Sequence, residues 1–304
     1  MKKWRTPGFM ISAGLFAVIA MGLYGLSWFF WGGRTGGDRG YGLGFGQHDV
    51  VGFIRIKGSI FDATNTVKTL TEFRRNPRVK SLLVRIDSPG GAVAPTQEIY
   101  GEIRRFRRTG RKVVASLGSV AASGGYYIAS AADKIFSYPG TVTGSIGVIV
   151  VLPNAEKILG NLGLSFNVIK SAPHKDIGSP LRKMTEEDRK IFERLIDDTY
   201  QQFVKAVSEG RRIPIDETRK IADGRIFSGE RAKELGLVDK LGGQWDAALE
   251  AGRLAKIPGE PKLLEIKLRG GVWGLLRQSL TGWLEGGPSS YLGGYPAVLQ
   301  YMWR

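Results

Sequence analysis

Short apolar runs alternate with longer amphipathic stretches between residues 50 and 254, and this alternation leaves few folds open to the chain. The apolar runs predict strands at 50–58, 79–87, 112–118 and 164–170. The amphipathic stretches predict helices at 63–76, 94–109, 154–162, 184–211, 214–222, 229–235 and 242–254. Strands that alternate with helices favour parallel pairing, so the sequence predicts an α/β fold with a mainly parallel sheet.

The longest predicted helix, 184–211, carries signals for both of its ends. Thr185 can cap its N-terminus. Three acidic residues follow in the first turn, where their negative charge interacts favourably with the helix dipole. Gly210 is expected to end the helix.

The first 48 residues predict a membrane anchor followed by a linker. Residues 1–8 are basic, and residues 9–31 form an uncharged apolar run that is long enough to span a bilayer. Because cationic residues precede the span, the N-terminus is expected in the cytoplasm and the remainder outside it. A cleaved signal peptide is the alternative, but the run ends in bulky aromatic residues rather than an A-x-A-like site.

Three further regions follow the predicted anchor. Residues 32–48 form a Gly-rich linker, residues 49–257 form the predicted catalytic domain, and residues 258–304 form an extension rich in Gly and aromatic residues. The extension is expected to pack on the domain or on a neighbouring subunit. The alternative is an amphipathic helix that rests on the membrane.

Composition narrows the chemistry. The 304 residues carry a net charge of +16, contain no cysteine, and include two histidines, His48 and His174. Disulfides, thiolate metal sites and metal sites built on several histidines are therefore excluded. The most basic run, RRFRRTGRK at 104–112, reads as a solvated surface or a contact with anionic lipid; the chain shows no nucleic-acid motif.

A serine between small residues is the candidate nucleophile. Ser123 lies in SVAASGGYYIASAADKI (119–135), where a β-rich segment gives way to a helical one. Small neighbours allow a sharp turn, and a helix that begins at the serine would direct free N–H groups at the reacting atoms. DSPGG (87–91) ends a predicted strand, so the N–H groups of Gly90 and Gly124 could form an oxyanion hole.

The base that activates this serine is left open by the residues alone. His174 with Asp133 or Asp176 would complete a Ser-His-Asp arrangement, and Lys175 would complete a Ser-Lys pair. Adjacent residues of an extended segment point to opposite sides, so we expect one of His174 and Lys175 to face Ser123. An ordinary lysine has a pKa of about 10.4 and must be desolvated, or placed near other positive groups, to act as a base.

Several ordered motifs resemble one family. The chain resembles the signal peptide peptidase family in its short single-domain SppA form. In chain order, the motifs that carry the resemblance are SPGG, AASGGYYIASAADKI, TGSIGV, HKDIGSP, ADGRIFSG and AKELGLVDKLGG. The resemblance covers roughly residues 50–255. It implies a Ser-Lys dyad protease on the fold of Clp protease subunits and crotonases, a repeated ββα superhelix.

The resemblance also implies roles for individual residues. Ser123 matches the nucleophile, Lys175 the general base, Gly90 and Gly124 the oxyanion donors, and Ser145 the serine that orients the lysine amine. It further implies a homo-oligomeric ring on the membrane, with Ser123 and Lys175 of one site contributed by neighbouring subunits.

The resulting expectation is a single-pass protein of the cell membrane whose extracytoplasmic serine endopeptidase degrades leftover signal peptides. Peptides, membrane lipid and copies of the chain are the expected partners, and the mechanism requires no metal or other cofactor. A Ser-His hydrolase and a crotonase-like acyl-CoA enzyme are the alternatives. The first lacks a G-x-S-x-G elbow here, and the second needs no Ser-Lys pair.

Overall fold

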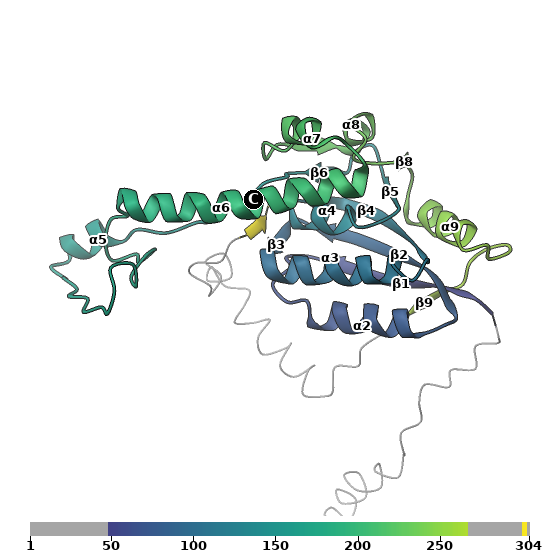
Figure 1. The fold of residues 1–304 in the computed structure, drawn as a ribbon, viewed down its shortest axis with the longest axis horizontal. Coiled ribbons are helices and arrows are strands. Elements are labelled where there is room, and N and C mark those ends of the chain that lie inside the picture. Colours follow the sequence, from purple (N-terminus) through teal and green to yellow (C-terminus); the bar gives the residue numbers. More distant parts are fainter. Residues whose placement is uncertain (1–47, 267–299, 303–304) are drawn as a thin grey trace, which may run out of the picture. The chain divides into compact units, whose positions relative to one another are not determined.

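The computed structural model describes residues 48–266 and 300–302 (Figure 1). The predicted anchor 9–31, the linker up to residue 47 and most of the C-terminal extension lie outside these ranges. Within the described ranges, no helix combines the length and the apolar character that crossing a bilayer requires.

A mostly parallel sheet forms the centre of the domain and confirms the predicted α/β class. The described residues contribute eight strands to it, and their path runs β7-β6-β4-β2-β1-β9, with β5 joining β4 to β8. All pairs are parallel except β6 with β7. The strands are β1 (Val50–Lys57), β2 (Val79–Ser88), β4 (Lys112–Ala122), β5 (Lys134–Ser137), β6 (Val142–Gly144), β7 (Ile226–Ser228), β8 (Lys240–Leu241) and β9 (Leu263–Glu265).

Apolar residues of the central strands pack against helices on both sides of the sheet. On one side lie α2 (Thr64–Arg75), α3 (Val93–Arg107) and α4 (Gly124–Ala129), which share a core with alternate residues of β1, β2 and β4. On the other side, α9 (Gln244–Leu254) packs its alanines against the intervening residues of the same strands. Successive side chains of a strand point to opposite faces, so near-continuous apolar runs suit a sheet that is covered twice.

The long helix α6 (Glu186–Arg211) is packed along its C-terminal half only. Apart from Asp188, its buried residues are Thr199, Phe203, Val204, Ala206 and Val207. Residues 149–198, called the arm below, comprise the N-terminal half of α6, the short helix α5 (Glu156–Asn161) and the loops around them. Figure 1 shows the arm reaching past the strands, and α5 buries no residue.

Two short helices, α7 (Ile215–Ile221) and α8 (Gly229–Glu234), follow α6.

The predicted cap of α6 is confirmed, since Thr185 and Asp188 form a capping box. The predicted end at Gly210 is wrong, because Arg212 with φ of 58° ends the helix instead. Gly210 serves close packing: a Cβ there would lie 2.1 Å from the carbonyl oxygen of Ser130.

The strand expected at 164–170 is absent from the described arm. This segment has the alternating apolar pattern of a strand, yet Leu164, Phe166 and Val168 are about half exposed and no strand lies beside it. A strand needs a partner for its backbone groups, and the arm of a single chain provides none among the described residues.

Candidate active site

The carboxyl ends of three strands meet at one edge of the sheet. Strands β2 and β4 are parallel neighbours, and so are β4 and β6. Gly90, Ser123 and Ser145 each follow the end of one of these strands within two residues. This edge of a parallel sheet is the usual location of sites in α/β proteins.

Ser123 has a backbone conformation that is rare for a residue with a side chain. Its φ is 53° and its ψ is −118°, and it forms the N-cap of α4. Its N–H donates to the Gly144 carbonyl at 2.8 Å, and its own carbonyl accepts the N–H of Tyr127 at 2.8 Å. Bonds to β6 and α4 thus hold a strained turn in place, and such strain is concentrated at functional sites.

The hydroxyl of Ser123 has no hydrogen-bond partner among the residues described. The residue is 1% exposed and directly follows the end of β4.

Two glycines lie where the sequence predicts an oxyanion hole. Gly124 is the first residue of α4, so its N–H has no partner within the helix. Gly90 has φ of 102°, and its N–H donates to the hydroxyl of Ser88 at 3.1 Å. A Cβ at Gly125 would lie 2.8 Å from the carbonyl oxygen of Ser88, so the absence of a side chain there lets α4 approach this segment closely.

Ser145 lies beside Ser123 because their strands are in register, with Ala122 opposite Gly144. Its φ is 51°, and its N–H donates to the carbonyl of Arg225 at 2.8 Å. A hollow of about 560 Å³ opens beside it. The apolar side chains that line this hollow are those of Ile146, Val148, Ile149, Ile196, Tyr200 and Ala222.

Lys175 lies on the arm and is exposed. No hydrogen bond or ion pair joins it to Ser123 within the described chain. The structure therefore brings Gly90, Ser123, Gly124 and Ser145 to one edge, and it holds Lys175 on a separate projection.

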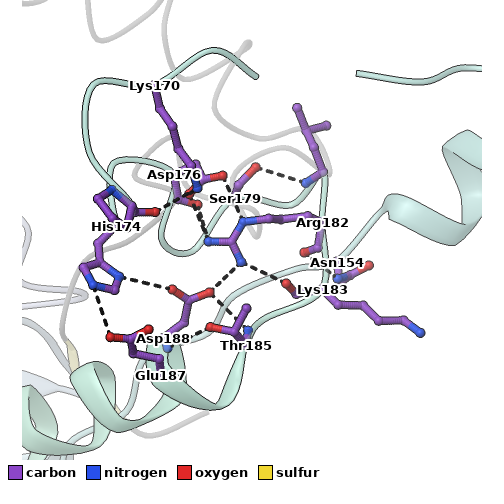
Figure 2. A network of polar contacts seen from close by, with 12 residues as sticks. Asn154, Lys170, His174, Asp176, Ser179, Arg182, Lys183, Thr185, Glu187 and Asp188 are labelled. Carbon is purple, nitrogen blue, oxygen red and sulfur yellow. Dashed lines mark hydrogen bonds and ion pairs between the residues drawn. The ribbon is translucent and has the colours of Figure 1, made fainter. Parts of the chain in front are cut away.

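A network of ion pairs fixes the segment that carries Lys175 (Figure 2). The guanidinium of Arg182 binds the Asp176 carboxylate through Nε and Nη2, both at 3.0 Å, and it binds Asp188 through Nη1 at 2.5 Å. Lys170 donates to Asp176 at 2.7 Å. One arginine thus ties the residue after Lys175 to the first turn of α6.

The two carboxylates of this network are held in their ionised form. Hydrogen bonds from Arg182 and Lys170 keep the pKa of Asp176 well below its ordinary value. Arg182, and then the N–H of Thr185, lower the pKa of Asp188 to about 2. Asp188 is also 3% exposed in its side chain, so little water competes for these bonds.

The histidine alternative finds no support in these contacts. His174 lies 3.5 Å from Glu187 and 3.9 Å from Asp188, in the first turn of α6 (Figure 2). Asp133 pairs with Arg107 at 2.9 Å and accepts the N–H of Val113, so it stabilises the fold. Neither Asp133 nor Asp176, the two acids of the Ser-His-Asp alternative, pairs with His174 in the described chain, so neither orients the histidine toward Ser123.

The segment around Gly90 carries an extended chain along one side. Strand β3 (Gly90–Ala92) pairs antiparallel with β10 (Gln300–Met302), so that Met302 lies opposite Gly90. The end of the extension thus lies on the strand that contains a predicted oxyanion donor. This finding agrees with the expectation that part of the extension packs on a domain.

Two contacts beside the candidate residues were not predicted. Ser88, which engages the N–H of Gly90, is part of the DSPGG motif, so the motif contained the signal without specifying the contact. Arg182 lies seven residues beyond Lys175, and no spacing rule relates the two, so its role could be found only in the folded segment.

A large part of this chain is similar to known proteins. The family model described as Peptidase family S49 matches residues 105–258, which include Ser123 and Lys175. The Synechocystis sp. protein named "Putative protease slr0021" is 44% identical over 218 residues, covering 70% of this chain and 76% of that protein.

Two further relatives differ in length. The Enterococcus faecium protein named "Putative signal peptide peptidase SppA" is 36% identical over 62% of this chain and 54% of its own length. The Arabidopsis thaliana "Serine protease SPPA, chloroplastic" is 32% identical over 72% of this chain and 32% of its own length.

Proposed function

Because the chain belongs to peptidase family S49, we propose that it is a membrane-anchored serine endopeptidase that uses a Ser-Lys dyad. Ser123 is the nucleophile, Lys175 the general base, Gly90 and Gly124 the oxyanion donors, and Ser145 orients the lysine amine. The strained conformation of Ser123 at the N-terminus of α4 carries this proposal, since such a conformation is costly and is concentrated at functional sites.

The base is supplied by a neighbouring copy of the chain. Lys175 sits on an arm whose apolar side chains are exposed, among them Ile158 (65%), Leu162 (68%) and Ile169 (100%). Several exposed apolar side chains on one projection support an interface with another chain. The unpaired strand pattern at 164–170 points the same way. In a closed ring of copies, each arm reaches the next copy, so every Ser123 receives a lysine and every arm has a partner.

The reaction follows from these roles. Neutral Lys175 accepts the proton of the Ser123 hydroxyl while the oxygen attacks a peptide carbonyl, and the N–H groups of Gly90 and Gly124 bind the oxyanion. Gly90 must then share or release its bond to Ser88. The lysine ammonium protonates the leaving amine as the C–N bond breaks, and water activated by the same lysine hydrolyses the acyl-enzyme.

The substrate is an apolar peptide bound in extended form. The pairing of β10 with β3 supports this, because it demonstrates that the Gly90 strand accepts an antiparallel chain. The apolar hollow beside Ser145 suits a substrate side chain. Leftover signal peptides meet both requirements, and a relative bears the name of signal peptide peptidase.

The remaining parts of the proposal concern placement. Residues 9–31 anchor the chain in the cell membrane, with residues 1–8 in the cytoplasm and the catalytic domain outside it, near lipid and its substrates. The parallel sheet with helices on both faces supports the fold shared by Clp protease subunits and crotonases.

Site-directed variants of the full-length protein in detergent test the dyad. We expect Ser123→Ala and Lys175→Ala each to abolish cleavage of a fluorogenic apolar peptide, because one removes the nucleophile and the other its base. Lys183→Ala is the matched control, since Lys183 is another exposed lysine of the arm. An active Lys175→Ala protein together with an inactive His174→Ala protein would contradict the dyad and favour a Ser-His hydrolase.

A further inference from the structure

The basic run at 104–112 divides into two groups with different surroundings. Arg107 donates to the Ala131 carbonyl and pairs with Asp133 at 2.9 Å. Arg111 donates to four backbone carbonyls and stacks on Phe106, with 4.2 Å between its guanidinium carbon and the ring centre. These two arginines stabilise the fold. Their role leaves the other cations of the run to be explained.

The other arginines line a groove between α3 and α6. Its volume is about 460 Å³. The α3 wall presents Arg104, Arg105 and Arg108, with Tyr100 and Gly101, and the α6 wall presents Gln202, Lys205, Ala206 and Glu209. A Cβ at Gly101 would have no neighbour within 4 Å, so this wall leaves open space. Tyr127 of α4, which is 5% exposed, contributes to the lining.

Positive charge exceeds negative charge in this lining. Four cationic side chains line the groove. The lining contains one carboxylate, that of Glu209, and it already pairs with Arg104 at 3.3 Å. Arg105 pairs with Glu102, but Glu102 is shared with Arg74. Arg108 and Lys205 have no ion pair with any residue that the structure describes. Cations that converge on a concave surface create a positive potential that attracts an anion.

The geometry of this groove points to a phosphate group as its ligand, and we propose that it binds one. Arg105 of α3 and Arg108 at its C-cap line one wall, and Lys205 of α6 lines the other, so one anion in the groove can bind both walls. Guanidinium groups match the paired oxygens of a phosphate, and lysine adds a point charge. The phosphate belongs either to an anionic phospholipid headgroup or to a small soluble phosphate compound.

The bound phosphate would join two parts of the domain. The α3 and α6 walls are already linked by Gln97 with Gln202 at 2.8 Å and by Arg104 with Glu209. Helix α4, which contributes Tyr127, begins next to Ser123, and α6 continues into the arm that carries Lys175. The site itself is independent of the proposed dyad, because its ligand needs neither residue.

Paired double variants of the full-length protein in detergent micelles test the site. Arg108→Gln with Lys205→Gln removes the two cations that lack an ion pair. Arg219→Gln with Lys220→Gln removes the same charge from α7, where both cations pair with acidic neighbours. Binding of inorganic phosphate is measured by the shift in unfolding midpoint at constant ionic strength. Binding of lipid is measured by native mass spectrometry, with phosphatidylglycerol against phosphatidylcholine.

We expect the groove variant to bind on the order of tenfold more weakly than the parent and the α7 variant. Retention of phosphatidylglycerol but not phosphatidylcholine, lost in the groove variant, would identify a lipid headgroup. A phosphate-dependent shift without lipid retention, lost in the same variant, would identify a soluble ligand. Equal binding by the two double variants, or no binding of either probe by the parent, would overturn the proposal.

Discussion

Ser123 shows how a single residue can carry strain that its neighbours maintain. Its φ of 53° is unfavourable for any residue with a Cβ, while glycine adopts this region freely. The N–H of Ser123 bonds to Gly144 whatever the side chain is, so the turn persists when the side chain changes. Stability differences among variants at this position therefore report backbone strain.

We predict that Ser123→Gly is more stable than Ser123→Ala by about 1 kcal/mol, although both are inactive. Relief of this sparsely populated backbone conformation is worth roughly 1–3 kcal/mol, and it exceeds the extra entropy of glycine in the unfolded chain, about 0.4–1 kcal/mol. Denaturant unfolding of the two variants measures the difference. If alanine were the more stable replacement, Ser123 would not be strained.

At the residue scale, the sequence predicted the positions of those candidate residues whose backbone is fixed by a motif. The small residues around Ser123 and the glycines of DSPGG implied sharp turns after strands, and parallel pairing then brought Gly90 and Ser145 to the same edge. The contact between Ser88 and Gly90 depends on side-chain rotation, and the contact between Arg182 and Asp176 depends on a loop path. Neither leaves a periodic trace in the sequence.

The segment before α6 is stabilised by charge more than by packing. Residues 171–183 contain no regular helix or strand, and Asp176, Arg182 and Asp188 hold them to the helix. A segment with few buried apolar contacts opens at low free energy unless such bonds fix it. The arm should therefore respond to substitutions and to pH that leave the packed domain unchanged.

We predict that Arg182→Ala increases hydrogen exchange of residues 171–183 and lowers kcat, with the sheet unaffected. The variant leaves Asp176 and Asp188 without their shared partner, and Lys175 loses its fixed backbone. Arg189→Ala is the control, because Arg189 makes one long contact of 4.0 Å with Glu186. Arg182→Lys should recover part of the protection. Equal exchange in the Arg182→Ala and Arg189→Ala proteins would contradict the role of the network.

Acid should release the same segment in the parent protein. The pKa of Asp188 is lowered from 3.8 to about 2, so its contribution to stability is fully present above pH 3.8 and is lost as the pH falls toward 2. Asp176, whose pKa is also lowered, acts in the same direction. Protection of residues 171–183, corrected for intrinsic exchange rates, should stay constant at neutral pH and fall below pH 3.8. Protection that rose with acidification would reverse this assignment.

Elements of the sheet and its covering helices were predictable because each buries an apolar face in the same chain. The strand expected at 164–170 failed for the opposite reason. Its alternating residues are apolar but about half exposed, and no described strand pairs with the segment, which agrees with the proposed contact between copies of the chain. The end of α6 was missed because Gly210 meets a packing constraint at Ser130.

At the scale of the whole molecule, the proposed nucleophile and base lie on parts of the chain that have different environments. Ser123 is buried at the edge of a packed sheet, whereas Lys175 is exposed on the arm. A chain that kept the two apart permanently would have no base for its serine. The proposed assembly of copies would bring the two residues together, and the exposed apolar side chains of the arm support it.

Mixing two inactive variants tests whether the site is shared. We predict that Ser123→Ala and Lys175→Ala chains, coexpressed in equal amounts with different tags, recover about a quarter of the parental activity. Each site takes its serine and its lysine from two different chains, each intact with a probability of about one half. Either variant alone should stay inactive. Purification through both tags verifies mixed assembly, so inactive mixed assemblies would mean that Ser123 and Lys175 act within one chain, with the arm folding back on its own domain.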